Sequence, residues 1–191
     1  MTTTTVLAYL LIICYFIIER SLRQGEKALS LQAGEADRGS SKLIWISGLL
    51  GILLVLLAPM LNAYRIGFWN NGYISWLGLL IMLNGLGLRY WAAKVLGEFY
   101  TRTLQTVEGQ QIIEQAPYST IRHPGYLGTF LMEIGAGLAI ANWIVLAIVV
   151  ITGIVSRVYR IQVEEEMLNA AFEERYKVYS KTTWRLVPFI Y

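Results

Sequence analysis

The chain has 191 residues, of which 55% are hydrophobic and 15% are charged, with a formal net charge of +3 and a mean hydropathy of +0.49. This composition excludes an ordinary soluble domain. One cysteine alone also excludes an internal disulfide and a thiolate metal cluster. The sequence therefore predicts an all-α, polytopic integral membrane protein.

Three uncharged stretches in the first half are long enough to cross a bilayer. Charges are absent from residues 1–18, 43–64 and 66–88, and a spanning helix needs about 20 apolar residues. The first stretch has no basic start and no small-residue cleavage pattern, so we expect a retained helix. The predicted spans are about 4–18, 43–61 and 73–95. We expect no site in the polar loop 19–42.

Glycines and tryptophans in these spans predict how the helices pack and sit in the bilayer. Glycines let membrane helices approach closely, and tryptophans near span ends are typical of interfacial anchors rather than of a cofactor cage. The glycines are Gly48, Gly51, Gly78, Gly85 and Gly87. The tryptophans are Trp45, Trp69, Trp76, Trp91 and Trp143.

The second half predicts a helical hairpin. Residues 124–156 carry one charge, Glu133, and suit two short spans joined near Asn142 and Trp143. A carboxylate inside a span is costly unless it is paired or faces water. Glu133 is therefore either a pocket or lateral-entrance residue, or a structural hydrogen-bonding group within the bundle.

The distribution of Lys and Arg predicts the topology. They number five in 19–42, four in 89–122 and six from Arg157 onward, but none before Ile18. Because cytoplasmic loops carry this excess, we expect the N-terminus outside and the C-terminus in the cytosol. The prediction is about five transmembrane helices, with spans 4 and 5 forming a hairpin over 125–161. A C-terminal amphipathic cytosolic helix follows, on the spacing of Leu168, Phe172, Tyr176 and Tyr179.

Two polar clusters border the hairpin. The only histidine lies in residues 121–128 (IRHPGYLG), which alone fits either a reactive site or a basic turn into a membrane helix. Arg157, Arg160 and Glu164 share one helix face, which alone fits an ion pair with snorkelling arginines. The hairpin places both clusters at one cytoplasmic rim. We therefore expect them to face a single cavity.

Five motifs follow one another in the C-terminal half: GEFYTRT, PYSTIRHPGYLG, RIQVEEE, FEERYKVY and RLVPF. Their order and spacing resemble the isoprenylcysteine carboxyl methyltransferase family, and prokaryotic-type relatives in particular. The resemblance covers residues 96–191 and implies a membrane methyltransferase that uses S-adenosylmethionine. It implies one structural unit, in which 1–95 holds three N-terminal spans and a cytosolic loop. Residues 96–191 then hold the cofactor connector, the hairpin and the C-terminal helix.

The resemblance also implies roles for individual residues. Glu164 looks like the acid that holds the cofactor's polar end, and Arg160 is similar to the arginine that meets the substrate carboxylate. We expect His123 to position the cofactor rather than abstract a proton. The residues implied in cofactor binding are Thr103, Gln110, Gln111, Ile112, Ile113, Tyr118, His123, Pro124, Gly125, Tyr126 and Glu164.

The expected reaction is methyl esterification of the carboxylate of an isoprenylcysteine, or a similar lipophilic acid that enters from the bilayer. An α-carboxyl group has a pKa of about 3.5 and is ionised at neutral pH, so no general base is required. Two alternatives stay open: a phospholipid amine or thiol acceptor, and a non-enzymatic membrane module or transporter. Besides membrane lipids, we expect neither a metal nor nucleic acid as a partner.

Overall fold

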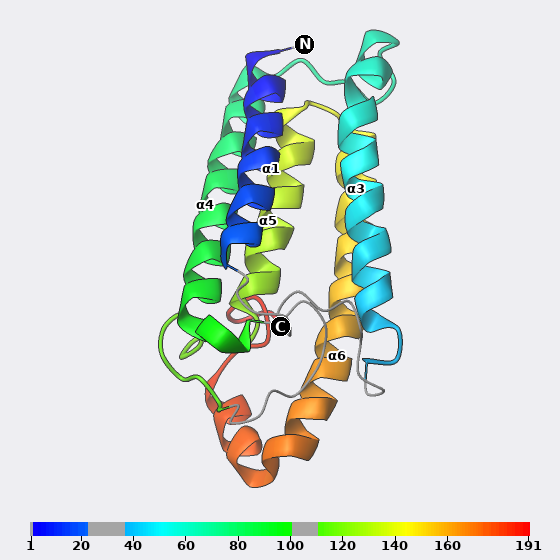
Figure 1. Cartoon of the computed structure of the whole chain (residues 1–191). Helices are drawn as coiled ribbons and strands as arrows, with labels where there is room; N and C mark the ends of the chain where they lie inside the picture. The colour runs from blue at the N-terminus through cyan, green and yellow to red at the C-terminus, as the bar shows by residue number, and fades with distance from the viewer. Residues whose placement is uncertain (1, 23–36, 101–110) are drawn as a thin grey trace.

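A computed structural model describes residues 2–22, 37–100 and 111–191 of the chain (Figure 1). These residues form a helical bundle, and the predicted fold class is confirmed. Within the described ranges the helices are α1 (Thr3–Leu22), α3 (Ser40–Ala63), α4 (Gly72–Leu96), α5 (Pro124–Ala139) and α6 (Trp143–Thr182), with a short 3₁₀ turn η2 (Gly97–Phe99). Helices α1, α3, α4 and α6 are long and apolar enough to span a membrane, whereas α5 has 16 residues.

Helix ends follow local signals in the sequence. The Asn71 side chain accepts a hydrogen bond from the first turn of α4, and Asn142 does the same for α6. Pro124 occupies the first turn of α5. Asn142 also donates to Asn62 Oδ1 (2.7 Å) and to the Ile66 carbonyl (2.8 Å). The predicted hairpin turn is therefore confirmed, and the side chain of Asn142 links the start of α6 to the end of α3.

The helices pack in the spatial order α1, α4, α5, α6, α3. Figure 1 shows α1, α4 and α5 on one side of the bundle and α3 with α6 on the other. The N-terminus and the α5–α6 turn lie at one end, which we call the upper end. The start of α5 and η2 lie at the opposite, lower end.

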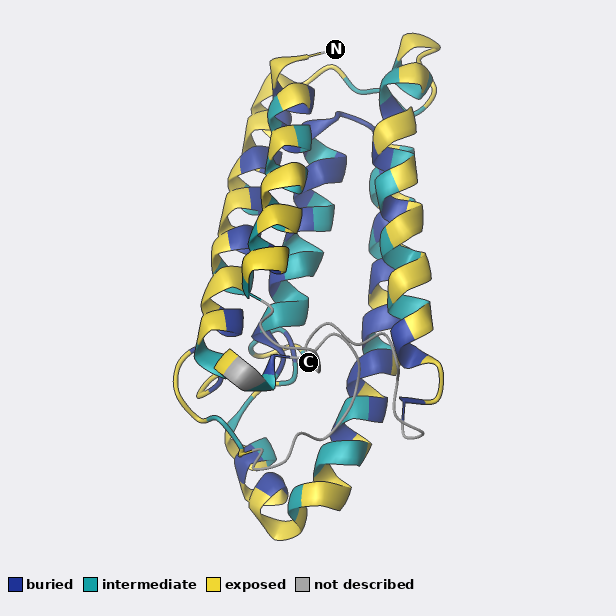
Figure 2. Ribbon diagram, viewed as in Figure 1, coloured by how far each residue is buried: buried dark blue, intermediate teal, exposed yellow. Residues whose placement is uncertain are grey.

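Exposed residues lie along the length of the outer surface of the bundle (Figure 2). Large hydrophobic side chains are exposed on the four long helices, although water would make such a surface costly. They include Leu10, Ile17, Leu49, Leu56, Leu80, Leu83, Ile151 and Val155. The protein is therefore an integral, multi-pass membrane protein.

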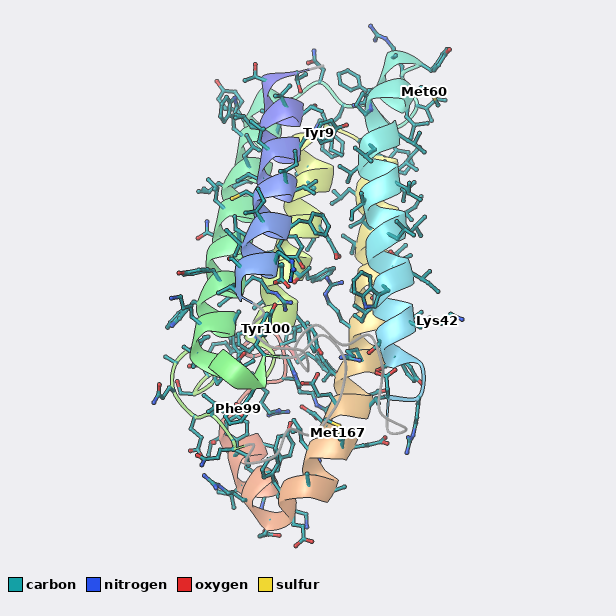
Figure 3. The ribbon with its side chains drawn as sticks, in the orientation of Figure 1. Tyr9, Lys42, Met60, Phe99, Tyr100 and Met167 are labelled. Carbon is teal, nitrogen blue, oxygen red and sulfur yellow. The ribbon has the colours of Figure 1, made fainter. Side chains whose placement is uncertain are left out.

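The upper half of the bundle has a closely packed core. Its buried residues come from all five helices and from the turn that follows α5: Ala8, Val55, Ala58, Leu79, Met82, Ala136, Ala139, Ile140, Val145 and Val149. The Tyr9 hydroxyl joins α1 to α3 there by donating to the Val55 carbonyl at 3.1 Å (Figure 3). The two sides of the bundle are therefore held together at the upper end.

Glycines bring α4 and α5 into backbone contact. A Cβ at Gly85 would lie 2.5 Å from the Gly128 carbonyl oxygen, and one at Gly78 would lie 2.6 Å from that of Gly135. Close approach is therefore confirmed for Gly78 and Gly85. The prediction of close approach is wrong for Gly48 and Gly87, because an added Cβ meets no atom within 4 Å at either position. Gly51 makes an ordinary contact, with Val149 at 3.8 Å.

The predicted C-terminal amphipathic helix is the continuation of α6. Helix α6 runs for 40 residues and is broken at Glu173, where φ is 47° and ψ is −121°. After the break, Tyr176 and Tyr179 are buried against the lower end of the bundle. The last part of α6 therefore folds back under the bundle (Figure 1).

Replacing Gly85 by Leu tests the α4–α5 contact. The side chain must displace the α5 backbone, so we predict a loss of stability of at least about 1–3 kcal/mol. Gly87→Leu on the same helix is the matched control and should leave the thermal midpoint in detergent nearly unchanged. Equal midpoints for the two variants would contradict the packing described here.

Candidate active site

The turn that precedes α5 is fixed by main-chain pairing with the C-terminal segment. The Arg122 N–H donates to the Trp184 carbonyl (2.7 Å), and the His123 N–H donates to the Arg185 carbonyl (3.1 Å). Pro124 follows without a backbone donor, at a position where a helix does not use one. This pairing holds the His123 side chain at the base of α5.

The carboxylate of Glu165 binds three basic side chains at this turn. Arg122 Nε donates to Oε1 at 2.8 Å, and Arg185 Nε donates to Oε2 at 2.9 Å. His123 Nε2 lies 3.4 Å from Oε1. Because Glu165 and Arg122 are both buried, removal of this carboxylate would leave an uncompensated charge.

Tyr126 links the two polar clusters that the sequence singled out. Its hydroxyl donates to Glu164 Oε2 at 2.6 Å and accepts from Arg160 Nε at 2.9 Å. Its ring stacks on His123, with centroids 5.6 Å apart and an interplanar angle of 17°. Arg160 and Glu164 are therefore connected through a hydroxyl group from α5.

Arg160 forms its ion pair with Asp37, just before α3. Its Nη1 lies 2.7 Å from Asp37 Oδ1 and also donates to the hydroxyls of Ser40 and Ser41. Burial raises the pKa of Asp37, but hydrogen bonds from both serines and the charge of Arg160 outweigh it and hold this pKa below its ordinary value. The pair is therefore ionised at neutral pH, and its stabilising effect is lost only as the pH falls through that lowered pKa.

Two further ion pairs lie deeper in the bundle. Arg157 Nη2 lies 2.7 Å from Glu133 Oε1, which joins α6 to α5. Arg89 Nε lies 2.7 Å from Glu19 Oε1, which joins α4 to α1, and the Tyr100 hydroxyl donates to the same oxygen at 2.6 Å. Charges in a low-dielectric bundle persist when paired in this way.

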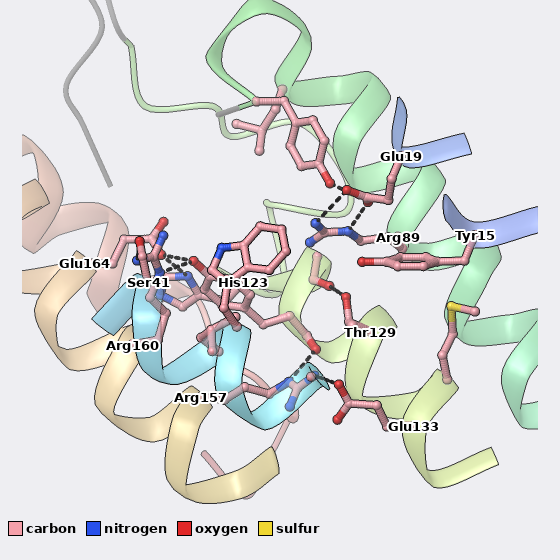
Figure 4. Close-up of a pocket in the computed structure, with 18 of the residues that line it drawn as sticks. Tyr15, Glu19, Ser41, Arg89, His123, Thr129, Glu133, Arg157, Arg160 and Glu164 are labelled. Carbon is pink, nitrogen blue, oxygen red and sulfur yellow. Dashed lines mark hydrogen bonds and ion pairs between the residues drawn. The ribbon is translucent and has the colours of Figure 1, made fainter. Parts of the chain in front are cut away.

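The two further ion pairs line one cavity of about 1140 Å³, together with His123, Tyr126, Arg160 and Glu164. Asp37, Arg122 and Glu165 lie outside its lining. Figure 4 shows Arg160, Glu164 and Ser41 on one side of its polar part, and Arg89 with Glu19 on the other. A second part, the apolar slot, continues between the helices toward the core. The slot is lined by Ile12, Phe16, Ile44, Gly48, Ile52, Val55, Met132, Ala136 and Val149.

Among the described residues, one acidic group of the cavity has no arginine partner. Its described carboxylates are Glu19, Glu133 and Glu164. The first two are paired with Arg89 and Arg157. Glu164 instead accepts the Tyr126 hydroxyl, and its Oε2 is 3.9 Å from His123 Nδ1. The arrangement therefore favours a ligand that brings a positive charge to Glu164.

Most residues that the sequence implicated meet at this cavity, as the hairpin prediction requires. Its lining includes Gln111, Ile112, Ile113, Tyr118, His123, Gly125, Tyr126, Arg160 and Glu164. Pro124 is fully buried but does not contribute to the lining. Thr103 and Gln110 lie outside the described residues. Glu133 was predicted to be either a pocket residue or a structural group within the bundle. It is both, because it lines the cavity and forms an ion pair with Arg157.

Sequence reasoning missed the contribution of the first half of the chain. The expectation of no site in the loop 19–42 is wrong, because Glu19 and Ser41 line the cavity and Asp37 holds Arg160. Trp45, expected only as an anchor, lines the cavity as well. Arg89 was not singled out, although it was the charge that ended an apolar run.

The fold and this cavity define a multi-pass membrane protein with a charged chamber open to an apolar slot. Residues 76–170 match the model of the isoprenylcysteine carboxyl methyltransferase (ICMT) family. Over these residues, about half of the chain, the protein is similar to this family.

Named relatives and a solved structure agree with this similarity. A probable protein-S-isoprenylcysteine O-methyltransferase of Oryza sativa subsp. indica is 28% identical over 139 residues, 71% of this chain and 68% of that protein. The protein-S-isoprenylcysteine O-methyltransferase of Rattus norvegicus is 31% identical over 131 residues, 64% of this chain and 45% of the relative.

The structure of a eukaryotic intramembrane Ras methyltransferase, ICMT, has a similar fold. It superposes with a TM-score of 0.67 at 21% identity, over 75% of this chain and 52% of that one. This chain thus spans about half the length of the rat relative and of the solved structure.

Glu165→Gln tests whether one carboxylate fixes the lower end. It leaves Arg122 unpaired in a buried position, so we predict a loss of about 3–5 kcal/mol and faster proteolysis of the C-terminal segment. Glu166→Gln is the control, because Glu166 forms an exposed pair with Arg38, in which 61% and 63% of the respective side chains are accessible. Such a pair contributes about 0–1 kcal/mol. Similar thermal midpoints for both variants would refute the role of Glu165.

Proposed function

We propose that this protein is an S-adenosylmethionine-dependent methyltransferase of the membrane. Its proposed acceptor is the carboxylate of an isoprenylcysteine or a similar lipophilic acid. The observation that carries the proposal is Glu164, a carboxylate without an arginine partner among the described residues. It lies beside an aromatic pair, in a chamber continuous with an apolar slot.

The polar chamber fits S-adenosylmethionine. This cofactor has a sulfonium and an amino group, which the charge of Glu164 can balance. The stacked rings of His123 and Tyr126 offer aromatic faces to a cation or a flat base. The cavity of about 1140 Å³ is slightly larger than the usual range for one small ligand, roughly 300–1,000 Å³. Its size supports joint occupation by a cofactor and an acceptor.

The apolar slot fits the hydrocarbon part of the acceptor. It is formed by α1, α3, α5 and α6 within the part of the bundle whose long helices expose large hydrophobic side chains. Burial of a hydrocarbon chain there is favourable by about 0.8 kcal/mol per methylene. Entry from the bilayer rather than from water follows from this position.

The residues act by orientation and by exclusion of water. If bound, S-adenosylmethionine would supply a methyl group from its sulfonium to an acceptor carboxylate oxygen. The sulfur would keep the electrons of the broken bond, and no proton would need to be transferred. A guanidinium holds the carboxylate, and the resemblance assigns that role to Arg160. His123, fixed between Glu164 and Glu165, positions the cofactor. The apolar walls keep water from the reacting groups.

The two halves of the chain have different proposed roles at the cavity. Residues 96–191 provide the cofactor side of the cavity, and 1–95 provide most of the slot together with Glu19 and Arg89. We place the lower end, with the site and the C-terminus, in the cytosol and the N-terminus outside. The support is the excess of Lys and Arg in the segments at that end.

A methyl-transfer assay tests the function directly. Purified protein in lipid receives labelled S-adenosylmethionine with farnesylcysteine, phosphatidylethanolamine and a lipophilic thiol in parallel. We predict label on farnesylcysteine and release of S-adenosylhomocysteine. Preferential labelling of phosphatidylethanolamine or of the thiol would favour the alternative acceptors. Binding without turnover would favour a non-enzymatic module.

Glu164→Gln tests the cofactor side of the site. Loss of a charged hydrogen-bond acceptor should weaken S-adenosylmethionine binding about 10- to 100-fold. Glu166→Gln, two residues further along α6, should bind the cofactor like the wild type. Unchanged cofactor affinity in Glu164→Gln would remove the main support for the proposal.

Gly48→Phe tests the acceptor side. A Cβ at Gly48 meets no atom within 4 Å, and the residue lines the slot, so a benzyl group should occupy the slot without disturbing the helices. We predict a KM for farnesylcysteine raised by about tenfold or more with cofactor affinity retained. Gly87→Phe, equally unobstructed but outside the cavity lining, is the control. Normal KM in Gly48→Phe would show that the acceptor lies elsewhere.

A further inference from the structure

Of the arginines at the cavity that are not exposed, two have a guanidinium nitrogen without a hydrogen-bond partner among the described residues. Arg160 uses Nε and Nη1, which leaves Nη2. Arg89 uses Nε and Nη2 on the carboxylate of Glu19, at 2.7 and 3.4 Å, which leaves Nη1. The proposed reaction involves two ligands that each carry a carboxylate. Each free nitrogen therefore has a candidate anion.

The position of Arg160 suits the cofactor. The amino and carboxylate groups of its methionine part are bonded to one carbon, so an acid and a base must stand next to each other to bind both. Arg160 and Glu164 are one helical turn apart and touch the same Tyr126 hydroxyl. They provide this arrangement, and Asp37 fixes the Arg160 side chain from behind.

The position of Arg89 suits the acceptor. Its partner Glu19 lies on the face of α1 that also presents Ile12 and Phe16, and all three line the cavity. Arg89 therefore lies where the apolar slot meets the polar chamber. Figure 4 shows it beside Glu19 and Tyr15. A lipid whose tail fills the slot brings its headgroup to this point.

Arg89 has both room and charge for a second carboxylate. A Cβ at Gly125 would lie 2.8 Å from Nη1, so the absence of a side chain keeps that edge of the guanidinium open. Tyr100 donates to Glu19 and shares its negative charge. A guanidinium has five N–H donors in one plane, enough for two carboxylates at once.

We propose that Arg89 binds the carboxylate of the lipophilic acceptor, while Arg160 and Glu164 bind the amino acid end of the cofactor. This inference rests on the proposed function and changes the residue that holds the acceptor. It makes Arg89 the residue that distinguishes an acid from a neutral lipid of the same shape.

The test compares farnesylcysteine with its uncharged carboxamide in equilibrium binding to protein in lipid nanodiscs. Wild type should bind the acid about 10- to 100-fold more tightly. Arg89→Gln, made together with Glu19→Gln to avoid an unpaired buried acid, should bind acid and amide about equally and retain S-adenosylhomocysteine affinity. Arg160→Gln should show the reverse: acid preference kept and S-adenosylhomocysteine affinity reduced.

Gly125→Ala supplies a second variant that leaves the Arg89–Glu19 pair intact. Its methyl group obstructs Nη1, so binding of the acid should weaken by about tenfold while binding of the amide stays unchanged. Gly87→Ala, on the same helix as Arg89 and with open space around it, is the control.

The outcomes separate this inference from the proposed function. Acid preference that persists in the Arg89 variant, or disappears in Arg160→Gln, overturns the assignment while the wild-type methylation result stands. A wild-type protein that neither binds nor methylates the acid overturns the proposed function itself, and the inference with it.

Discussion

The pairing of charges inside an apolar bundle is the constraint on which the lower half of this structure depends. Arg89, Arg157 and Arg160 each bind a carboxylate from another segment of the chain. An unpaired charge in such surroundings costs several kcal/mol, so these pairs fix which helices meet at the lower end. Among the described residues, the same pairing leaves Glu164 without an arginine, and we propose that its charge favours a cationic ligand.

The upper end of the bundle holds the helices together, and the lower end contains the cavity. At the upper end a shared core holds the helices together, and α4 and α5 are in backbone contact at their glycines from Gly128, near the start of α5, to Gly135. Toward the lower end, the side formed by α1, α4 and α5 separates from the side formed by α3 and α6, and the cavity lies between them. Ion pairs line this cavity without filling it. The bundle thus combines close packing above with an open chamber below.

Local patterns explain how much could be predicted from sequence. Uncharged runs and capping residues identified the spans and the hairpin, and the hairpin brought His123 and Tyr126 to the same cavity as Glu164. The partners of the arginines could not be predicted, because Asp37 and Glu19 lie far from them in sequence and no periodicity relates them. Helix spacing suggested an Arg160–Glu164 pair, but competition from Asp37 and Tyr126 decided the contacts. Glu173 breaks α6 without a glycine or proline, so its sequence held no signal.

The central claim is that the start of α5 and the exit of α6 form one cofactor site. A double-mutant cycle with Tyr126→Phe and Glu164→Gln, read out as S-adenosylhomocysteine affinity by calorimetry, measures this directly. If the two side chains act as one unit through their 2.6 Å hydrogen bond, the effects should be non-additive, with a coupling energy of about 0.5–3 kcal/mol. Additive effects, or no effect of either change on affinity, would contradict the account.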